Sequence, residues 1–353
     1  MGNKKLSYLK MMICILVVLS LTLGCSALRR PSPEETPDRE PSEPQRPSQE
    51  EGPSKPAPED STQKPKLPEI LGAGQGQEPN LKVFIKDENR VQEMKMEEYI
   101  KSVVAGEIKN DWPPEAIKAQ AIIARTFVLD FIDEKGQSKF GKAHISTDIE
   151  EAQAWNPQAV NDRIKKAVDE TRGLVMVHQG KFVKGWFHSN AAGKTATPKE
   201  GLNYKKGDPP YIKSVESPDD SPKIPSDESN WVYKTSKAKI IEALGSMGKP
   251  VKDFSKVSIA EKGPSGRATV LAFDDTRVSA PDFRVALSST ELKSTMLDAV
   301  EMQGDQVVFK GRGYGHGVGM SQWGAYKMAE EGKKAEEILS HYFEGIEIVN
   351  MWK

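Results

Sequence analysis

Cysteine is almost absent from the 353-residue sequence: Cys14 and Cys25 are its only two, and both precede residue 26. Residues 26–353 therefore exclude a disulfide, a thiolate metal site and a cysteine nucleophile. Charge of one sign is also lacking, because +3 in residues 1–25 and −4 in residues 26–80 account for the total of −1. Residues 81–353 are thus nearly neutral, which argues against nucleic acid as a partner. Only one long apolar run is present, so a multi-span membrane protein is excluded.

That apolar run, residues 11–23, follows three lysines near the N-terminus. It is shorter than the roughly 20 residues that span a bilayer and suits the apolar region of an export signal. The next residues, Leu21-Thr22-Leu23-Gly24-Cys25, resemble a bacterial lipobox, in which the cysteine is acylated. We therefore expect residues 1–25 to be a lipoprotein-type signal peptide and the protein to be extracytoplasmic, anchored to the cell membrane through Cys25. The alternatives are a signal peptide that is cut elsewhere and an uncleaved anchor, both with Cys25 unmodified.

Aromatic residues are missing from residues 31–80, which hold 12 of the 24 prolines. Such a segment cannot bury enough apolar surface to offset the entropy lost on ordering. We predict a disordered Pro/Glu-rich linker over residues 26–80. Proline-rich chain reaches about 3 Å per residue as polyproline II, so the linker could hold a folded head on the order of 100 Å from a membrane.

The folded part is expected to begin near Leu81 with a strand over residues 81–86, followed by a helix over residues 96–107. Apolar residues of this helix recur at i, i+3, i+4, i+7 and i+8, and the stripe leads to Glu107. A carboxyl group at the end of a buried stripe has its pKa raised by desolvation, which suits a general acid near neutral pH. The alternative is a helix-terminal glutamate in solvent, which the periodicity alone favours.

A second helix is predicted from Pro113-Pro114 to about Ile132. Its apolar stretch contains Gln120 and Arg125, and a buried arginine needs an anionic or carbonyl partner. For Arg125 we consider either a structural ion pair or contact with a substrate or with Glu107.

Further along, residues 174–177 and 182–187 read as a hairpin whose second strand leads to His188 and Ser189, a location typical of site residues. Adjacent strand residues point to opposite faces, so this pair says little about a catalytic triad. A peptidase or esterase that uses Ser189 lacks a convincing acid partner and the expected strand-turn-helix motif.

Glycine occupies every second position from Gly311 to Gly319, a spacing that matches neither dinucleotide-binding nor phosphate-binding loops. We expect an extended segment with closely approached glycines on one side and Tyr314 and His316 on the other. Ser321 is predicted to cap the helix that follows.

Three blocks of the sequence together resemble the stage II sporulation protein D (SpoIID) family, which includes the amidase enhancers of cell-wall turnover. The blocks are the segment from Glu98-Tyr99 through Ala105-Gly106-Glu107 to Arg125-Thr126-Phe127, the pair Phe187-His188-Ser189 and Pro210-Tyr211-Ile212, and the run from Gly313 to Gln322.

The resemblance implies a lytic transglycosylase that cuts peptidoglycan glycan strands stripped of their stem peptides, with Glu107 as the catalytic residue, and it reverses the solvent interpretation. A single carboxyl group suffices for this reaction. The residues that the motifs place along the substrate groove are Gln120, Arg125, His188, Ser189, Tyr211, His316, Ser321 and Gln322.

The resemblance also implies an α+β fold: a two-lobed domain over residues 81–353 with a central groove and an inserted α+β lobe at about residues 225–305. Within that lobe we predict a helix near residues 236–245 and strands near 257–260 and 268–273. Some relatives bind zinc with cysteines near residues 141–155. Those cysteines are missing here, so we expect no metal and no cofactor, and His144 reads as a loop residue. The alternative function is a non-catalytic glycan-binding protein that stimulates an N-acetylmuramoyl-L-alanine amidase.

Overall fold

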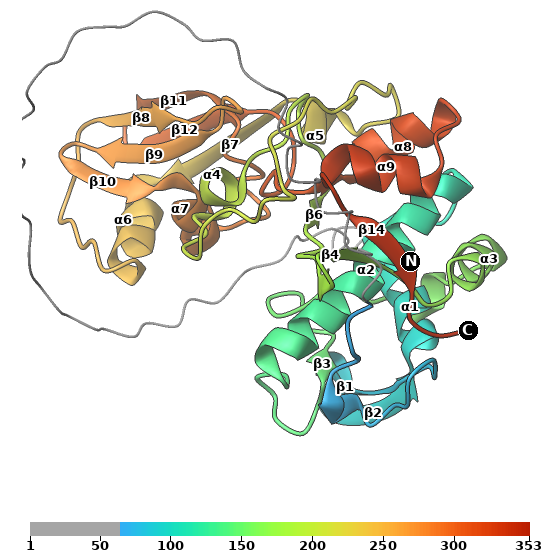
Figure 1. Cartoon of the computed structure of the whole chain (residues 1–353). Helices are drawn as coiled ribbons and strands as arrows, with labels where there is room; N and C mark the ends of the chain where they lie inside the picture. The colour runs from blue at the N-terminus through green and yellow to red at the C-terminus, as the bar shows by residue number, and fades with distance from the viewer. Residues whose placement is uncertain (1–63) are drawn as a thin grey trace, which may run out of the picture.

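The computed structural model describes residues 64–353 (Figure 1). The expected export signal, Cys25 and most of the expected linker lie outside these residues. No helix in the described part is long and apolar enough to cross a membrane. The described chain already packs before residue 81, because Leu71 is buried in the core and Gly76 forms a β-bridge with Trp352. The folded region therefore begins earlier than the boundary that composition predicted.

The larger of two hydrophobic cores gathers helices and small sheets from both ends of the chain (Figure 1). Its helices are α1 (Met96–Glu107), α2 (Pro114–Lys135), α3 (Asp162–Glu170), α4 (Pro198–Leu202), α8 (Gln322–Glu330) and α9 (Ala335–Tyr342). Its strands are β1 (Asn80–Ile85), β2 (Arg90–Lys95), β3 (Ile145–Ser146), β4 (Leu174–His178), β5 (Lys181–Phe182), β6 (Phe187–His188), β13 (Met320–Ser321) and β14 (Glu347–Asn350). This mixture of helices and small sheets confirms the predicted α+β class.

Helix α1 has the bounds that its apolar stripe predicts, because the stripe is what the core buries. Met96, Tyr99, Ile100, Val103 and Val104 are all fully buried. Helix α2 begins at the predicted proline pair and packs against α1, α3, α8 and α9.

The predicted hairpin is only partly correct. Strands β4 and β5 pair antiparallel, but the second strand ends at Phe182. Residues 187–188 instead form β6, which pairs in parallel with β13. Between β5 and β6 the chain passes close to α2, since a Cβ atom on Gly185 would lie 2.8 Å from the carbonyl oxygen of Ile123. The chain passes tightly over α2 at this point and leaves the hairpin.

A second, separate core lies between Trp231 and Phe309 and is seen beside the first in Figure 1. Its helices are α5 (Ser226–Ser229), α6 (Lys237–Ser246) and α7 (Ala280–Leu287). Its two sheets have the strand orders β10-β9-β8 and β11-β12-β7. The strands are β7 (Trp231–Ser236), β8 (Val257–Lys262), β9 (Ala268–Phe273), β10 (Thr276–Ser279), β11 (Leu297–Gln303) and β12 (Gln306–Gly311). The helix and two strands predicted in this region are present as α6, β8 and β9.

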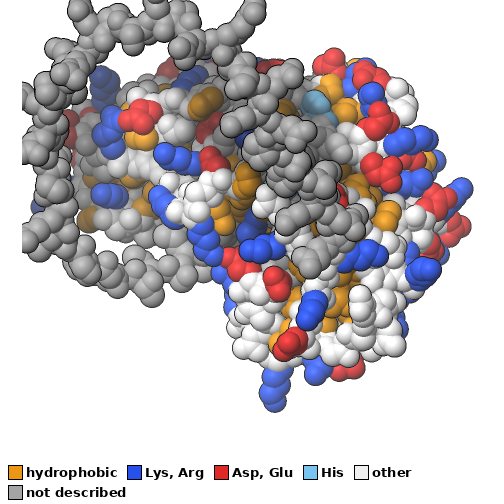
Figure 2. Space-filling view, viewed as in Figure 1, with side chains coloured by type: hydrophobic (Ala, Val, Ile, Leu, Met, Phe, Trp, Pro, Cys, Tyr) orange, Lys and Arg blue, Asp and Glu red, His pale blue; other side chains and the backbone are white. Residues whose placement is uncertain are grey.

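Buried polar contacts join the two cores. Arg267 is fully buried and lies in the loop between β8 and β9. Its guanidinium group donates hydrogen bonds to the carbonyl oxygens of Ala191 at 2.8 Å and Lys194 at 2.6 Å. Ser265 donates through its hydroxyl to Glu200 at 2.6 Å. On the face seen in Figure 2, basic and acidic side chains are interspersed, as expected for a nearly neutral folded part.

Candidate functional site

Glu107 is the last residue of α1, and only 5% of it is exposed. It continues the buried stripe, and the next residue, Ile108, is buried as well. The solvent-facing alternative that periodicity favoured is therefore wrong. Tertiary packing covers the end of the helix, which the pattern of α1 by itself does not reveal.

One carboxylate oxygen of Glu107 is held by the main chain, because Ala154 N–H donates to Oε1 at 2.6 Å. Burial raises the pKa of Glu107 to about 8, and donors from Ala154 and Gln322 oppose this rise. A carboxyl group with a pKa near the working pH can both give and take a proton. Glu107 thus has the electrostatic character of a general acid and base.

Of the two glutamines predicted as site residues, Gln322 contacts Glu107 and Gln120 contacts Gln322. Gln322, the first residue of α8, donates through Nε2 to the backbone oxygen of Glu107 and to Gln120 Oε1, both at 3.3 Å. Gln120 Nε2 has no hydrogen-bond partner within the described chain, and neither does the amide of Gln153, which precedes Ala154. Both side chains are fully buried. Buried amides without partners are unusual in folded proteins.

Three consecutive residues at the start of α8 contact acidic residues from three different segments, of which Glu107 and Glu228 are buried and Asp219 is half-buried. Ser321 donates its hydroxyl to Asp219, Gln322 contacts Glu107, and Trp323 Nε1 donates to Glu228 Oε2 at 3.2 Å. Ser321 also caps α8 as predicted, because its oxygen accepts from Gly324 N–H at 3.3 Å. The start of α8 therefore contacts three segments that carry acidic residues.

Ser189 belongs to the same region, since its hydroxyl donates to Glu228 Oε2 at 2.6 Å. Its described partner is thus a carboxyl group and not a histidine, which gives no support to a peptidase or esterase arrangement. Burial raises the pKa of Glu228, and burial likewise raises that of Asp219.

The glycine-rich segment does not adopt the extended conformation that we predicted. Gly313, Gly315, Gly317 and Gly319 all have positive φ angles, between 72° and 108°. Left-handed backbone of this kind favours glycine. At Gly317 a Cβ atom would also lie 2.4 Å from the guanidinium carbon of Arg267, so the glycines admit protein groups at close range.

Two predicted histidines are buried around this segment, with ring centroids 5.7 Å apart. The two rings contact the two backbone polar groups of Val318. His316 Nδ1 accepts from Val318 N–H at 3.0 Å, and His188 Nδ1 lies 3.2 Å from Val318 O. Burial, reinforced by nearby arginines, lowers the pKa of His316 to about 3, and burial holds the pKa of His188 well below its ordinary value. Both rings are therefore neutral near pH 7.

The described contacts of Arg125 and Tyr211 are with residues other than Glu107, and those of Arg125 confirm the structural ion pair that we considered for it. Arg125 is fully buried and forms a two-pronged ion pair with Glu97, with Nη2 and Oε2 2.7 Å apart. A buried arginine takes its anionic partner from inside the fold, and here that partner is Glu97. The hydroxyl of Tyr211 accepts from Lys184 N–H at 3.0 Å, and its ring packs on His178.

His144 and Asp148 lie in the segment of residues 141–155, where we expect no metal site. Within residues 64–353, no three His, Asp or Glu side chains are grouped so that they could hold a metal ion. His144 Nδ1 accepts from Lys82 N–H at 3.2 Å. Asp148 pairs with Lys86 at 2.7 Å and Lys139 at 3.0 Å, and although burial alone would raise its pKa, these lysines bring it below the ordinary value.

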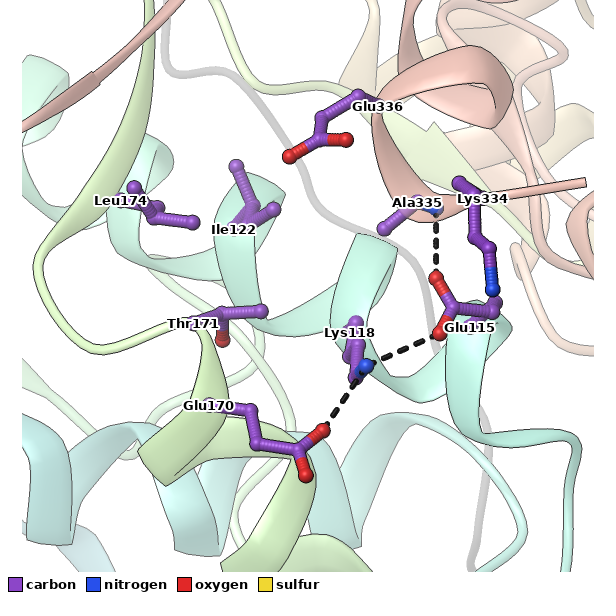
Figure 3. A pocket seen from close by; sticks show the side chains of 9 residues that line it. All are labelled: Glu115, Lys118, Ile122, Glu170, Thr171, Leu174, Lys334, Ala335 and Glu336. Carbon is purple, nitrogen blue, oxygen red and sulfur yellow. Dashed lines mark hydrogen bonds and ion pairs between the residues drawn. The ribbon is translucent and has the colours of Figure 1, made fainter.

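A pocket of about 220 Å³ lies between α2, α3 and α9 (Figure 3). Figure 3 shows Lys118 at its centre, between the carboxylates of Glu115 and Glu170, at 2.9 and 2.8 Å. Gln120 is two residues from Lys118, about 200° around the helix. The pocket therefore lies on the face of α2 opposite to the glutamine that contacts Gln322.

Sequence reasoning missed Ala154, Asp219 and Glu228. Ala154 contributes only its backbone N–H, so its side chain carries no signal. Asp219 lies in a polar stretch between Pro218 and Pro222 that has no periodicity. Both acidic residues become notable only because folding brings them into contact with the start of α8.

Comparisons with known proteins match most of the chain. Residues 85–178 match the family model described as Stage II sporulation protein (SpoIID), and residues 218–319 match a domain of unknown function, DUF8618. An uncharacterized protein of Brachyspira hyodysenteriae is 30% identical over 264 residues, which cover 74% of this chain and 68% of that protein.

Two relatives from Bacillus subtilis have informative names. Its stage II sporulation protein D is 29% identical over 276 residues, covering 73% of this chain and 75% of that protein. Its amidase enhancer is 26% identical over 290 residues, covering 70% of this chain and 39% of that protein. The first matched model includes Glu107, Gln120 and Ala154, and the second includes Asp219 and Glu228.

Proposed function

The chain belongs to the stage II sporulation protein D family, and on this basis we propose that it is a lytic transglycosylase that cleaves peptide-free peptidoglycan strands. The relatives' names, stage II sporulation protein D and amidase enhancer, support a sporulation-related role in the cell wall. The observation that carries the finer proposal is the buried Glu107, whose pKa is raised by burial to about 8.

The reaction needs one carboxyl group in two successive roles. With a pKa near 8, Glu107 is mostly protonated at neutral pH and can protonate the glycosidic oxygen. The resulting carboxylate then takes the proton from the C6 hydroxyl of muramic acid. That hydroxyl attacks C1 and leaves a 1,6-anhydro end. The Ala154 and Gln322 donors stabilise the carboxylate between the two steps.

Neighbouring groups support this assignment. Gln120 and Gln322 are placed to orient a glycan hydroxyl or acetamido group against Glu107, because Gln120 Nε2 has no partner within the described chain. Asp148, an alternative second carboxylate, is committed to two lysines. Ser321 and Ser189 support the region through Asp219 and Glu228.

We also propose that the protein acts outside the cytoplasm. The basis is the lipobox-like sequence ending at Cys25, preceded by an export-signal pattern and followed by a proline-rich linker. An anchor of this kind would tether the folded part to the membrane while the linker sets its reach toward the cell wall.

The direct test is cleavage of purified denuded strands by the wild type and by Glu107→Gln. The glutamine keeps the size of the side chain but cannot transfer the proton, so we expect a rate loss of about 10²–10⁴-fold. Glu98→Gln is the matched control, because Glu98 lies on the same helix with a side chain 63% exposed. Equal cleavage by Glu107→Gln and Glu98→Gln would contradict the assignment.

The alternative function makes a different prediction in the same assay. A relative is named amidase enhancer, which points to stimulation of a cell-wall amidase without glycan cleavage. If neither the wild type nor Glu107→Gln cleaves strands, and both bind strands and accelerate an amidase equally, the alternative replaces the transglycosylase.

A further inference from the structure

Gly106, which precedes Glu107 in the last turn of α1, is in close contact with another segment. A Cβ atom on Gly106 would lie 2.7 Å from both the backbone carbon of Ala154 and the backbone nitrogen of Trp155. Gly106 is not among the glycines with positive φ, so its conformation does not require glycine. Alanine is normally the better residue inside a helix. The space taken by the 154–155 backbone is therefore what excludes a side chain here.

The segment that packs on Gly106 is the one that holds Glu107. The N–H of Ala154 donates to Glu107 Oε1 at 2.6 Å. The segment is fixed on both sides, since Ala152 N–H donates to Asp148 O at 2.8 Å and Asn156 N–H donates to Ser102 O at 2.8 Å. An added methyl group at Gly106 would thus have to displace an anchored backbone.

On the basis of the proposed function, we propose that Gly106 is a positioning residue for the catalytic carboxyl group. Its missing side chain lets Ala154 N–H reach Glu107 Oε1, which fixes the carboxyl plane and leaves Oε2 for proton transfer. Gly106 touches no substrate atom in this arrangement. It acts through the position of the 154–155 backbone.

The arrangement has a consequence that a purely structural glycine would lack. A hydrogen bond to a carboxylate favours the ionised form and lowers its pKa. Loss of the Ala154 donor should therefore raise the pKa of Glu107 further, by about 1 to 2 pH units for a hydrogen bond to a charged group. Displacement of the carboxyl group should also lower kcat by about 10- to 100-fold with KM little changed.

The experiment compares Gly106→Ala with Gly245→Ala. Gly245 is the matched control because it is also the penultimate residue of a helix, α6, and a Cβ atom there would have no neighbour within 4 Å. In protein labelled with ¹³C at the glutamate carboxyl groups, the Glu107 resonance is assigned by its absence in Glu107→Gln. We expect its titration midpoint to rise by about 1 to 2 pH units in Gly106→Ala and to stay unchanged in Gly245→Ala.

A measurement on the wild type tests the contact even if Gly106→Ala fails to fold. The Ala154 amide proton should shift with the same midpoint as the Glu107 carboxyl resonance, because the two groups share a hydrogen bond. The inference would be overturned if the Ala154 amide shift does not titrate with the Glu107 carboxyl group. It would also be overturned if the titration midpoint of Glu107 is unchanged in folded Gly106→Ala. These readouts need no turnover. If Ala154 and Glu107 titrate together but the protein cleaves no strands, the proposed function is wrong and the contact between Ala154 and Glu107 is still supported.

Discussion

Replacement of Arg125 by methionine should destabilise the fold strongly. The side chains of Arg125 and Glu97 are 0% and 2% exposed, and Nε and Nη2 of the arginine donate to the two carboxylate oxygens at 3.1 and 2.7 Å. A third donor, Nη1, reaches Leu174 O at 2.8 Å. After the substitution Glu97 keeps only its bonds from Gly173 N–H at 3.0 Å and Trp352 Nε1 at 2.9 Å.

The expected cost follows from the buried charge that is left behind. Removal of one partner of a buried ion pair costs about 3–5 kcal/mol, and methionine fills most of the arginine volume. Arg277→Met is the control, because Arg277 and its partner Glu261 are 53% and 57% exposed. An exposed pair of that kind is worth about 0–1 kcal/mol.

Urea unfolding measures both variants, with the midpoint expected to fall for Arg125→Met while the m value stays unchanged. Addition of Glu97→Gln to Arg125→Met should restore part of the loss, since the unpaired charge is removed. A loss under about 1 kcal/mol together with a raised KM for glycan would refute this reasoning. Arg125 would then be the substrate-binding residue that its sequence position predicts.

Three further predictions concern pH, location and metal. Glu107 ionises near 4.5 when unfolded but only at about pH 8 when folded, so it costs roughly 1.4 kcal/mol per pH unit between these values. The free energy of unfolding of Glu107→Gln should therefore exceed that of wild type by roughly 3–5 kcal/mol at pH 8.5 and should equal it at pH 4. An equal difference at both pH values would contradict the burial argument. Cys25→Ser should move the protein out of the membrane fraction, and a variant that stays there, with no fatty acid incorporated by wild type, would favour the uncleaved anchor. Chelators should leave cleavage unchanged, because residues 26–353 lack thiols and the described histidines and carboxylates form no ligand cluster. Loss of bound zinc together with cleavage activity would contradict this prediction.

Local signals predicted the parts of the site that depend on one element. The stripe of α1 predicted the bounds of the helix, and Ser321 is a residue type that caps helices, whereas the burial of Glu107 followed only from the family resemblance. Gln120 and Gln322, named from motif position, contact each other in the fold.

Features that depend on contacts between distant segments could not be predicted in this way. After Phe182 the chain passes close to α2 at Gly185, and residues 187–188 pair with β13, more than 130 residues later in the sequence. The sequence leaves Arg125 either a structural ion pair or a substrate contact, and only the fold, which places Glu97 beside it, identifies the partner. The alternating glycines suggested an extended strand, whereas close packing by Arg267 and others goes with left-handed backbone.

The central claim is that Glu107 cleaves glycan strands by intramolecular attack of the C6 hydroxyl. Mass spectrometry of the fragments released from denuded strands tests it directly. Wild-type digests should contain 1,6-anhydromuramic acid ends, which are lighter than reducing ends by one water. Digests with Glu107→Gln should lack these ends. Fragments with reducing ends would contradict it, because water would then be the nucleophile and a second carboxylate would be needed.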